Sequence, residues 1–227
     1  PVALAIREQY LPSSADDPAP TTLPGLVVGL ADRLDSLAGL FAAGLAPTGS
    51  KDPFAQRRAA LGLVGNLIHW DLDLDLAMAL DNAAQDLQIQ ISTENRNAGM
   101  GFIQDRLHNY LRDEGYPYDV VDAVVTAQGD NPAGAFRAVK ILTGWVQKDD
   151  WELTLDSFAR CVRITRDLEV VYKVDPQVFE TPAEQALYAA LEQAEASLRS
   201  VQASAELARE TVVKASEGLE FDLELHG

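Results

Sequence analysis

Basic side chains gather in two short stretches of an otherwise acidic chain. Residues 47–70 carry Lys51, Arg57 and Arg58 against one aspartate and are net +2, while residues 131–173 are net +1 in a chain whose formal charge is −17. Guanidinium and ammonium groups contact phosphates, and the planar guanidinium also reads base edges. An anionic partner such as a nucleic acid is therefore expected to contact these two stretches first.

The second stretch contains a regular series of arginines. Arg160, Arg163 and Arg166 recur every third residue, and Arg137 and Lys140 form a similar pair upstream. Residues three apart lie close together on one helix face, so the spacing predicts a guanidinium stripe. An ordinary charged surface is an equally good interpretation, because acidic residues for local ion pairs stand nearby, namely Asp156, Asp167 and Glu169.

Arg57 and Arg58 are adjacent in the sequence and cannot share one helix face. We therefore expect at most one of them to face a partner and the other to form a structural ion pair. Lys51, Arg57 and Arg58 are expected to neutralise backbone phosphates, which gives affinity without reading the base sequence.

Other chemistries fit the sequence poorly. The run Asp71, Asp73, Asp75 has the alternation of an EF-hand loop, but Leu76 and Asn82 occupy the positions that need glycine and glutamate. These aspartates are better interpreted as a segment between helices that places negative charge at a helix N-terminus. The stretch TGSKDP, residues 48–53, lacks the spaced glycines of a phosphate-binding loop and predicts a turn followed by a helix.

Catalytic and metal-ligating residues are also not predicted. Three histidines, His69, His108 and His226, without a His-Asp dipeptide are too few for a metal-dependent hydrolase of the histidine-aspartate type. Cys161 is the single cysteine, which excludes an internal disulfide, and its apolar position predicts a core residue. We assign no catalytic residue and no metal site.

Hydrophobic periodicity predicts a mainly α protein. Leu26, Leu30, Leu34, Leu37 and Phe41 recur at steps of three and four residues, and Pro24 and Gly44 suit the two ends of that helix. A second helix is expected over residues 53–70, with Asp52 as N-cap, Pro53 as first residue and an apolar face of Phe54, Leu61, Val64, Leu67 and Ile68. Further helices are expected over residues 74–87, 99–113, 118–127, 131–147, 151–166 and 182–205.

Two helix ends carry specific signals. Gly115 stands where a left-handed residue closes a helix, and Thr181, Pro182 and Glu184 resemble a capping box. Strand-like alternation is weak and best at residues 87–91, 168–174 and 219–225.

Composition limits the class of protein. The chain has 227 residues, 47% hydrophobic and 23% charged, enough for a folded core of one large or two small domains. Its acidity disfavours nonspecific nucleic-acid binding over most of the surface. The uncharged run at residues 23–31 is too short to span a bilayer, and the first residue is Pro1, so we expect a cytoplasmic fragment of a longer protein.

Several long motifs resemble one known family. Residues 31–62 read ADRLDSLAGLFAAGLAPTGSKDPFAQRRAALG, residues 5–17 read AIREQYLPSSADD and residues 105–125 read DRLHNYLRDEGYPYDVVDAVV. These segments closely resemble the bacterial glycyl-tRNA synthetase β subunit, or the β-like half of its fused single-chain form. FARCVRI, residues 158–164, resembles the family's anticodon-binding element, with Arg160 and Ile164 matching and Ala159 and Arg163 departing from it.

The resemblance implies a division of the chain into three parts. Residues 1–46 would end a domain similar to histidine-aspartate domains, residues 47–130 would bind the tRNA body, and residues 131–227 would form an anticodon-binding-like helical domain. The parent enzyme joins glycine to tRNA(Gly) with ATP and Mg²⁺, in a class II catalytic domain on an α subunit or fused α half. This chain shows no class II motif, so we expect it to bind tRNA without catalysing the reaction and without holding a cofactor. The residues expected to bind tRNA are Lys51, Arg57, Arg58, Arg137, Lys140, Arg160, Arg163 and Arg166. Homodimerisation of the parent enzyme stays open.

A second hypothesis is that the chain is a helical module for protein–protein contact or oligomerisation within the synthetase. Its acidic bulk and long apolar helix faces would serve either role. Salt separates the two, because phosphate contacts weaken steeply with ionic strength and an apolar interface does not.

Overall fold

The computed structural model describes residues 2–13, 17–85, 87–170 and 173–217. By its own contacts the chain separates into two compact units, residues 1–160 and 161–227. Packing is a different criterion from function, so the three-part functional division given above stays a prediction.

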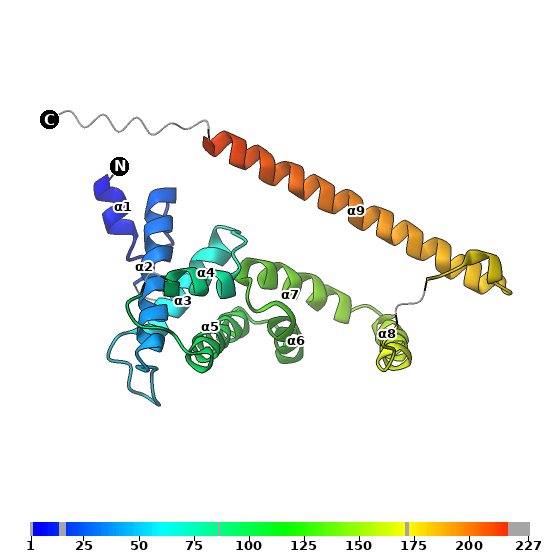
Figure 1. Ribbon diagram of the computed structural model, residues 1–227, viewed down its shortest axis with the longest axis horizontal. Helices are drawn as coiled ribbons and strands as arrows, with labels where there is room; N and C mark the ends of the chain where they lie inside the picture. Colours follow the sequence, from blue (N-terminus) through cyan, green and yellow to red (C-terminus); the bar gives the residue numbers. More distant parts are fainter. Residues whose placement is uncertain (1, 14–16, 86, 171–172, 218–227) are drawn as a thin grey trace. The chain divides into compact units, whose positions relative to one another are not determined.

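The described part of the chain is helical, which confirms the predicted fold class (Figure 1). The described elements are α1 (Val2–Glu8), α2 (Leu23–Ala42), α3 (Gln56–His69), α4 (Leu76–Gln85), α5 (Thr93–Asp113), α6 (Tyr118–Gln128), α7 (Pro132–Val146), α8 (Trp151–Thr165), a 3₁₀ turn (Pro176–Val178) and α9 (Pro182–Glu217). Within the same residues, none of the helices is both long and apolar enough to cross a membrane.

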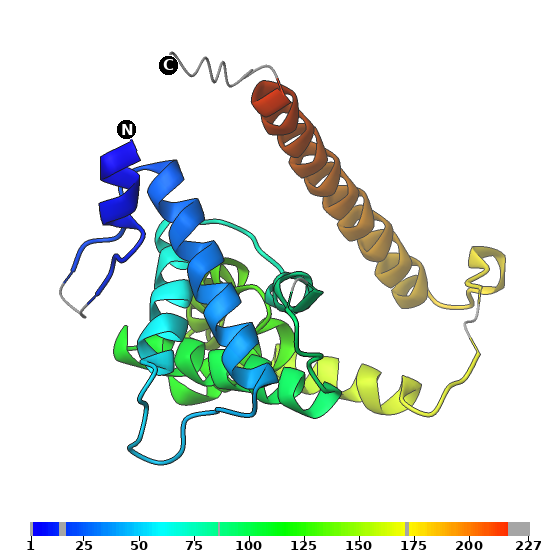
Figure 2. The ribbon, with the colours of Figure 1, turned by 60° about the vertical axis from the view of Figure 1, so that its left-hand side comes forward.

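The core of the first unit is built from α2 to α7. Figure 2 shows α2 running beside α3, with α5 against them, and these helices contribute most of the buried side chains. The largest fully buried apolar side chains are Leu26, Leu37, Leu63, Val64, Leu67, Leu76, Ile103, Leu107, Leu111, Val121 and Val139. Leu26, Leu30, Leu37 and Phe41 are buried and Leu34 is half-buried, so the stripe predicted for α2 is confirmed.

The predicted start of α3 is wrong by three residues. The helix begins at Gln56, after Ala55 adopts a positive φ of 55°. The N-cap is Ala55 and not Asp52 as predicted, but the Asp52 carboxylate still accepts hydrogen bonds from the backbone N–H groups of Gln56 and Arg57 at 2.8 and 2.9 Å. Pro53 therefore lies in the preceding turn rather than in the helix.

Two of the residues predicted for the apolar face of α3 are not buried. Val64, Leu67 and Ile68 are buried, but Phe54 lies in the turn and is 51% exposed. Leu61 lies within the helix but is 40% exposed.

Buried Arg33 holds the segment between α1 and α2 against the core. Its guanidinium donates to the carbonyl oxygens of Gln9 and Leu11 at 2.8 and 2.9 Å. The group approaches α3 at Gly62, where an added Cβ would lie only 2.8 Å from Nε of Arg33. A glycine at position 62 is therefore required for this contact.

Two side chains of α3 and its C-terminal end hold the same segment. Asn66 donates through Nδ2 to the carbonyl oxygen of Leu11 at 3.0 Å, and Trp70 donates through Nε1 to that of Pro20 at 3.0 Å. Leu11 and Pro20 are thus both held beside α3.

Glu8 fixes α1 to the start of α2. Its carboxylate accepts hydrogen bonds from the hydroxyl and backbone N–H of Thr21 and from those of Thr22. These donors, first the two hydroxyls, lower the pKa of Glu8 from 4.5 to about 2. The charged carboxylate is therefore the form that stabilises this junction.

The two predicted helix-end signals are confirmed. Gly115 closes α5 with φ +90°. At the start of α9 the backbone N–H of Thr181 donates to Glu184 at 2.7 Å, and the N–H of Glu184 donates to the Thr181 hydroxyl at 3.3 Å. This reciprocal pair is a capping box.

Other boundaries and the strand signals differ from expectation. α5 begins at Thr93 rather than at residue 99, because Ser92 caps it by accepting from Asn95 N–H at 3.1 Å. No strand forms at residues 87–91 or in the described part of residues 168–174, where no neighbouring strand is available for pairing. The alternation at residues 219–225 lies outside the described residues.

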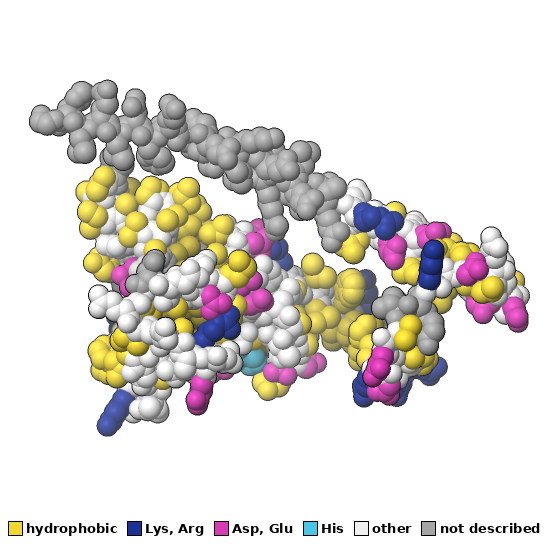
Figure 3. Space-filling view, in the orientation of Figure 1, with side chains coloured by type: hydrophobic (Ala, Val, Ile, Leu, Met, Phe, Trp, Pro, Cys, Tyr) yellow, Lys and Arg dark blue, Asp and Glu magenta, His cyan; other side chains and the backbone are white. Residues whose placement is uncertain are grey.

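Exposed apolar side chains gather on α8 and, separately, on α1 with the start of α2. α8 has no buried residue, and its stripe of Trp151, Leu155, Phe158 and Val162 has only partial cover. Cys161 is exposed beside this stripe, so its prediction as a core residue is wrong. Figure 3 shows a second gathering over α1 and the start of α2, formed by Val2, Leu4, Ile6, Leu23, Val27 and Val28.

Candidate nucleic-acid interface

The basic cluster at the start of α3 consists of Lys51, Arg57 and Arg58. Arg57 donates to the carbonyl oxygen of Gly49 and lies 3.8 Å from Asp52, so its guanidinium supports the turn before the helix. Arg58 is exposed and forms no ion pair or hydrogen bond within the described residues, and Lys51 is also exposed. Arg57 therefore has the structural ion pair expected for one of the two adjacent arginines, and which of them faces a partner stays a prediction.

A groove of about 680 Å³ begins at this cluster. One wall is α3, the second is the C-terminal half of α5, and the third is the anchored segment after α1. Arg57 and Arg58 line it together with His69 from α3 and Arg106, Asn109 and Tyr110 from α5. The groove lies wholly within the first compact unit.

Sequence analysis missed the contribution of α5. Residues 71–130 are net −9, so their net charge did not predict a contact with an anionic partner. The spacing of Arg106, Asn109, Tyr110 and Asp113 nevertheless places these side chains on one helix face, and this signal could have revealed the groove wall. Net charge over a window conceals a local cation.

Arg106 and Asn66 bring buried polar atoms to the groove walls. The guanidinium of Arg106 lies 4.9 Å from the ring centre of Phe102, and its Nε is buried without a hydrogen-bond partner among the described residues. Asn66 is fully buried, and its Oδ1 likewise has no partner there. A buried donor and a buried acceptor are thus left unsatisfied next to the same cavity.

The groove also contains carboxylates. Asp17, Asp113 and Glu114 line it, and Ser13 donates its N–H to Asp17 at 2.9 Å. Burial first, and then the charge of Glu114, raise the pKa of Tyr110. Tyr110 therefore stays a neutral hydrogen-bond donor at neutral pH.

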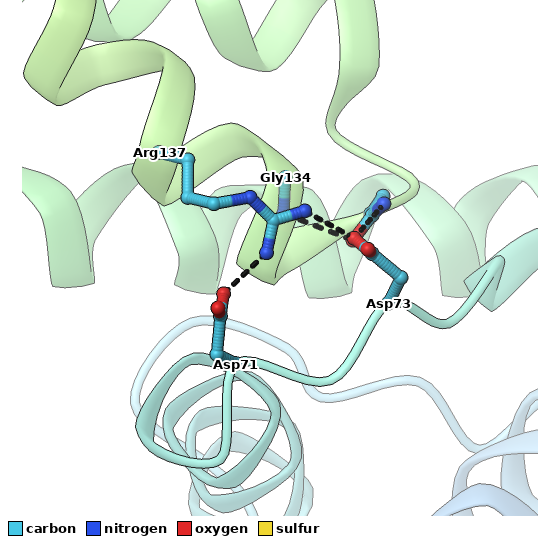
Figure 4. A network of polar contacts seen from close by, with 5 residues as sticks. Asp71, Asp73, Gly134 and Arg137 are labelled. Carbon is cyan, nitrogen blue, oxygen red and sulfur yellow. Dashed lines mark hydrogen bonds and ion pairs between the residues drawn. The ribbon is translucent and has the colours of Figure 1, made fainter. Parts of the chain in front are cut away.

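Arg137 is occupied by two aspartates. Its guanidinium lies between Asp71 and Asp73 and donates to both, at 2.5 Å to Asp73 (Figure 4). The hydrogen bond to Asp73 is the main cause that raises the pKa of Arg137. Asp75 accepts from the N–H of Met78 at 2.9 Å and so caps α4, as the expectation of negative charge at a helix start required.

Lys140 follows one turn later on α7 and is exposed. Its Nζ lies 4.0 Å from the ring centre of Phe136, a cation–π contact that leaves the ammonium open to solvent.

The arginine series of the second stretch is only partly on one helix. Arg160 pairs with Asp156 at 2.8 Å along α8, as the ordinary-surface interpretation expected. Arg163 is exposed on α8, while Arg166 lies just after the helix ends at Thr165. A role of these three residues in tRNA binding stays a prediction.

No group of three or more His, Cys, Asp or Glu side chains is arranged to hold a metal ion in the described ranges.

A family model described as glycyl-tRNA synthetase beta subunit matches residues 1–126. The chain belongs to this family. The matched region contains the basic cluster at the start of α3 and the whole groove. The resemblance recognised in the sequence motifs is thereby confirmed.

Individual relatives agree with the family match. The glycine–tRNA ligase beta subunit of Ectopseudomonas mendocina is 37% identical over 206 residues, which cover 89% of this chain and 30% of that relative. The subunit of Moorella thermoacetica is 35% identical over 208 residues, covering 87% of this chain and 30% of the relative. The chain therefore spans about 30% of the length of the glycyl-tRNA synthetase β subunits that it matches.

Proposed function

We propose that this chain is a tRNA-binding portion of glycine–tRNA ligase. It would hold tRNA(Gly) while a catalytic α subunit, or a fused α half, attaches glycine. ATP and Mg²⁺ would be bound in that catalytic part, and this chain would contribute no catalytic residue. Homodimerisation of the complete enzyme is compatible with this role.

The observation that carries the proposal is the state of the cations at the start of α3. Arg58 is exposed without a partner among the described residues, and Lys51 is exposed nearby in sequence, within a chain of net charge −17. An exposed, unpaired guanidinium is ready to contact a phosphate, whereas Arg137 would first have to leave two aspartates.

The surrounding acidity supports specific rather than general RNA binding. Phosphates are repelled from most of the surface, so the RNA is restricted to the few cationic places. Lys140 and the arginines 160, 163 and 166 would supply a second contact region, in which unstacked bases of the anticodon loop are accessible to guanidinium planes.

Binding of the chain to tRNA(Gly) and to an unrelated tRNA over a salt series tests the proposal. We expect tighter binding of tRNA(Gly), and affinity for both that falls steeply with salt. A triple alanine variant of Arg160, Arg163 and Arg166 should reduce the preference for tRNA(Gly) if these residues contact the anticodon. Absence of binding to either RNA at low salt would contradict the proposal.

The exposed apolar surfaces favour a second candidate, a protein-contact module of the synthetase. Leu155 is 49% and Phe158 65% exposed on α8, and Val27 is 53% exposed on α2. Such side chains gain free energy when a partner covers them. Salt-insensitive binding to the catalytic subunit without binding to tRNA would favour this candidate.

A further inference from the structure

We propose that the groove between α3 and α5 binds a single unpaired nucleotide, with its base inside and its phosphate at the Arg58 end. This inference rests on the proposed tRNA-binding function and identifies the part of an RNA that the groove takes. The same chemistry would admit a free mononucleotide, and the experiment below separates these two sources.

The size of the groove fits one nucleotide. A cavity of about 680 Å³ lies within the range of small-molecule sites and is too small for a helical RNA stem. The guanidinium of Arg33 and the amide of Asn66 hold Gln9 and Leu11, next to this wall, against α3.

The lining offers planar groups for stacking. Tyr110 lies against Gly65, where an added Cβ would be 3.7 Å from the ring, so the ring packs against bare helix backbone. Arg106 presents a guanidinium plane that already lies over the ring of Phe102. Single-stranded RNA bases are recognised by stacking on aromatic rings and guanidinium planes.

The polar atoms of the groove suit a base edge. Asn109 offers an amide donor and acceptor. Asp113 and Glu114 accept hydrogen bonds from amino groups, as acidic side chains do from cytosine. Nε of Arg106 and Oδ1 of Asn66 are buried behind the lining and have no hydrogen-bond partner among the described residues, so they are not counted among the groups that face a base.

The charge pattern separates base from phosphate. The carboxylates Asp17, Asp113 and Glu114 repel phosphate from the interior and accept a neutral base. Arg58 lines the groove from the first turn of α3 and is exposed. It is therefore the residue expected to contact the attached phosphate.

Two hairpin RNAs provide the test. Both carry the same stem, but one ends blunt and the other has three unpaired nucleotides at its 3′ end. The dissociation constants are measured by fluorescence anisotropy for the wild-type chain and for Asn109→Ala, Tyr110→Leu and Tyr110→Phe. Asn97→Ala is the matched control, because Asn97 is exposed on the same helix and does not line the groove.

The wild-type chain is expected to prefer the hairpin with unpaired nucleotides. Tyr110→Leu should weaken that binding about ten-fold, since one lost base stack costs about that much, while Tyr110→Phe retains the ring and most of the affinity. Asn109→Ala should lower the preference, and Asn97→Ala should not. Thermal melting of each variant establishes that it is folded.

Other results would overturn the inference in distinguishable ways. Equal affinity for both hairpins, or a preference that survives Tyr110→Leu and Asn109→Ala, removes the groove from RNA binding but leaves the proposed function standing. If no RNA binds, the proposed function fails. Titration of the four nucleoside monophosphates, followed by NMR of the side-chain amides, then tests whether the groove binds a free nucleotide. Shifts at Asn109 but not at Asn97 would support a site for free nucleotides, and unchanged spectra would contradict any nucleotide site.

Discussion

The helices α2 to α7 and the helix α8 have the same kind of sequence pattern but different surroundings. Leu107 on α5 is fully buried, whereas Leu155 on α8 is 49% exposed although it belongs to an equally regular apolar stripe. Periodicity therefore predicts that a helix forms and which face is apolar, but it does not say what covers that face. Two of the helices with buried apolar faces, α3 and α5, line the groove, whereas α8 has an exposed apolar face.

Core truncation should show the largest difference between these regions. We expect Leu107→Ala to lower the free energy of unfolding by about 2 to 5 kcal/mol, because it leaves a cavity in a fully packed site. Leu155→Ala should change it by no more than about 0.5 kcal/mol. Urea unfolding measures both, and an equally large loss for Leu155→Ala would mean that α8 is covered in solution.

Two glycines, one within α5 and one just after it, test the backbone conformation of this helix. Gly115 has φ +90°, which an L-residue adopts only with strain, so Gly115→Ala should destabilise the chain by roughly 1 kcal/mol. Gly101→Ala in the middle of α5 meets open space and should stabilise it by about 0.5 to 1 kcal/mol. Thermal melting that shifts in the same direction for both variants would contradict this assignment.

Acid should act on the first unit through Glu8. Its folded-state pKa of about 2 lies below the ordinary 4.5, so its contribution is complete above about pH 5 and is lost as the pH falls toward 2. Glu8→Gln should lower the melting temperature at pH 7 and make it less dependent on pH between 5 and 2. A wild-type and a variant curve that remain parallel over this range would argue against the role of Glu8.

Surface ion pairs should have the smallest effects. Arg137→Met removes contacts to Asp71 and Asp73, and Arg160→Met removes one pair within α8. Exposed pairs contribute at most about 1 kcal/mol and a pair within one helix about 0.3 to 0.5 kcal/mol. Melting temperatures at low and high salt test whether Arg137→Met destabilises the chain more than Arg160→Met does. A larger loss of stability for Arg160→Met would contradict this expectation.

The helices could be predicted from the sequence because their caps are local. Gly115 and the Thr181–Glu184 pair act within a few residues of themselves, and both predictions were right. The predicted start of α3 failed because Ala55 takes a left-handed conformation that no residue-type preference indicated.

The groove could not be predicted because it depends on contacts between distant segments. Arg33, Asn66 and Trp70 bind carbonyl oxygens up to 55 residues away, and nothing in their spacing specifies those partners. Exposure of Cys161 was missed for a similar reason, since an apolar position on a helix does not reveal whether another element covers it.

The central proposal is that tRNA contacts Arg58, which is exposed at the start of α3 and forms no ion pair or hydrogen bond within the part of the chain that the structure describes. The most direct measurement is the affinity for tRNA(Gly) of Arg58→Ala and Arg137→Ala as a function of salt. We predict that Arg58→Ala weakens binding and lowers the slope of log affinity against log salt by about one, the loss of one phosphate contact, while Arg137→Ala leaves both nearly unchanged. A wild-type slope and affinity for Arg58→Ala, or a larger loss for Arg137→Ala, would contradict the account.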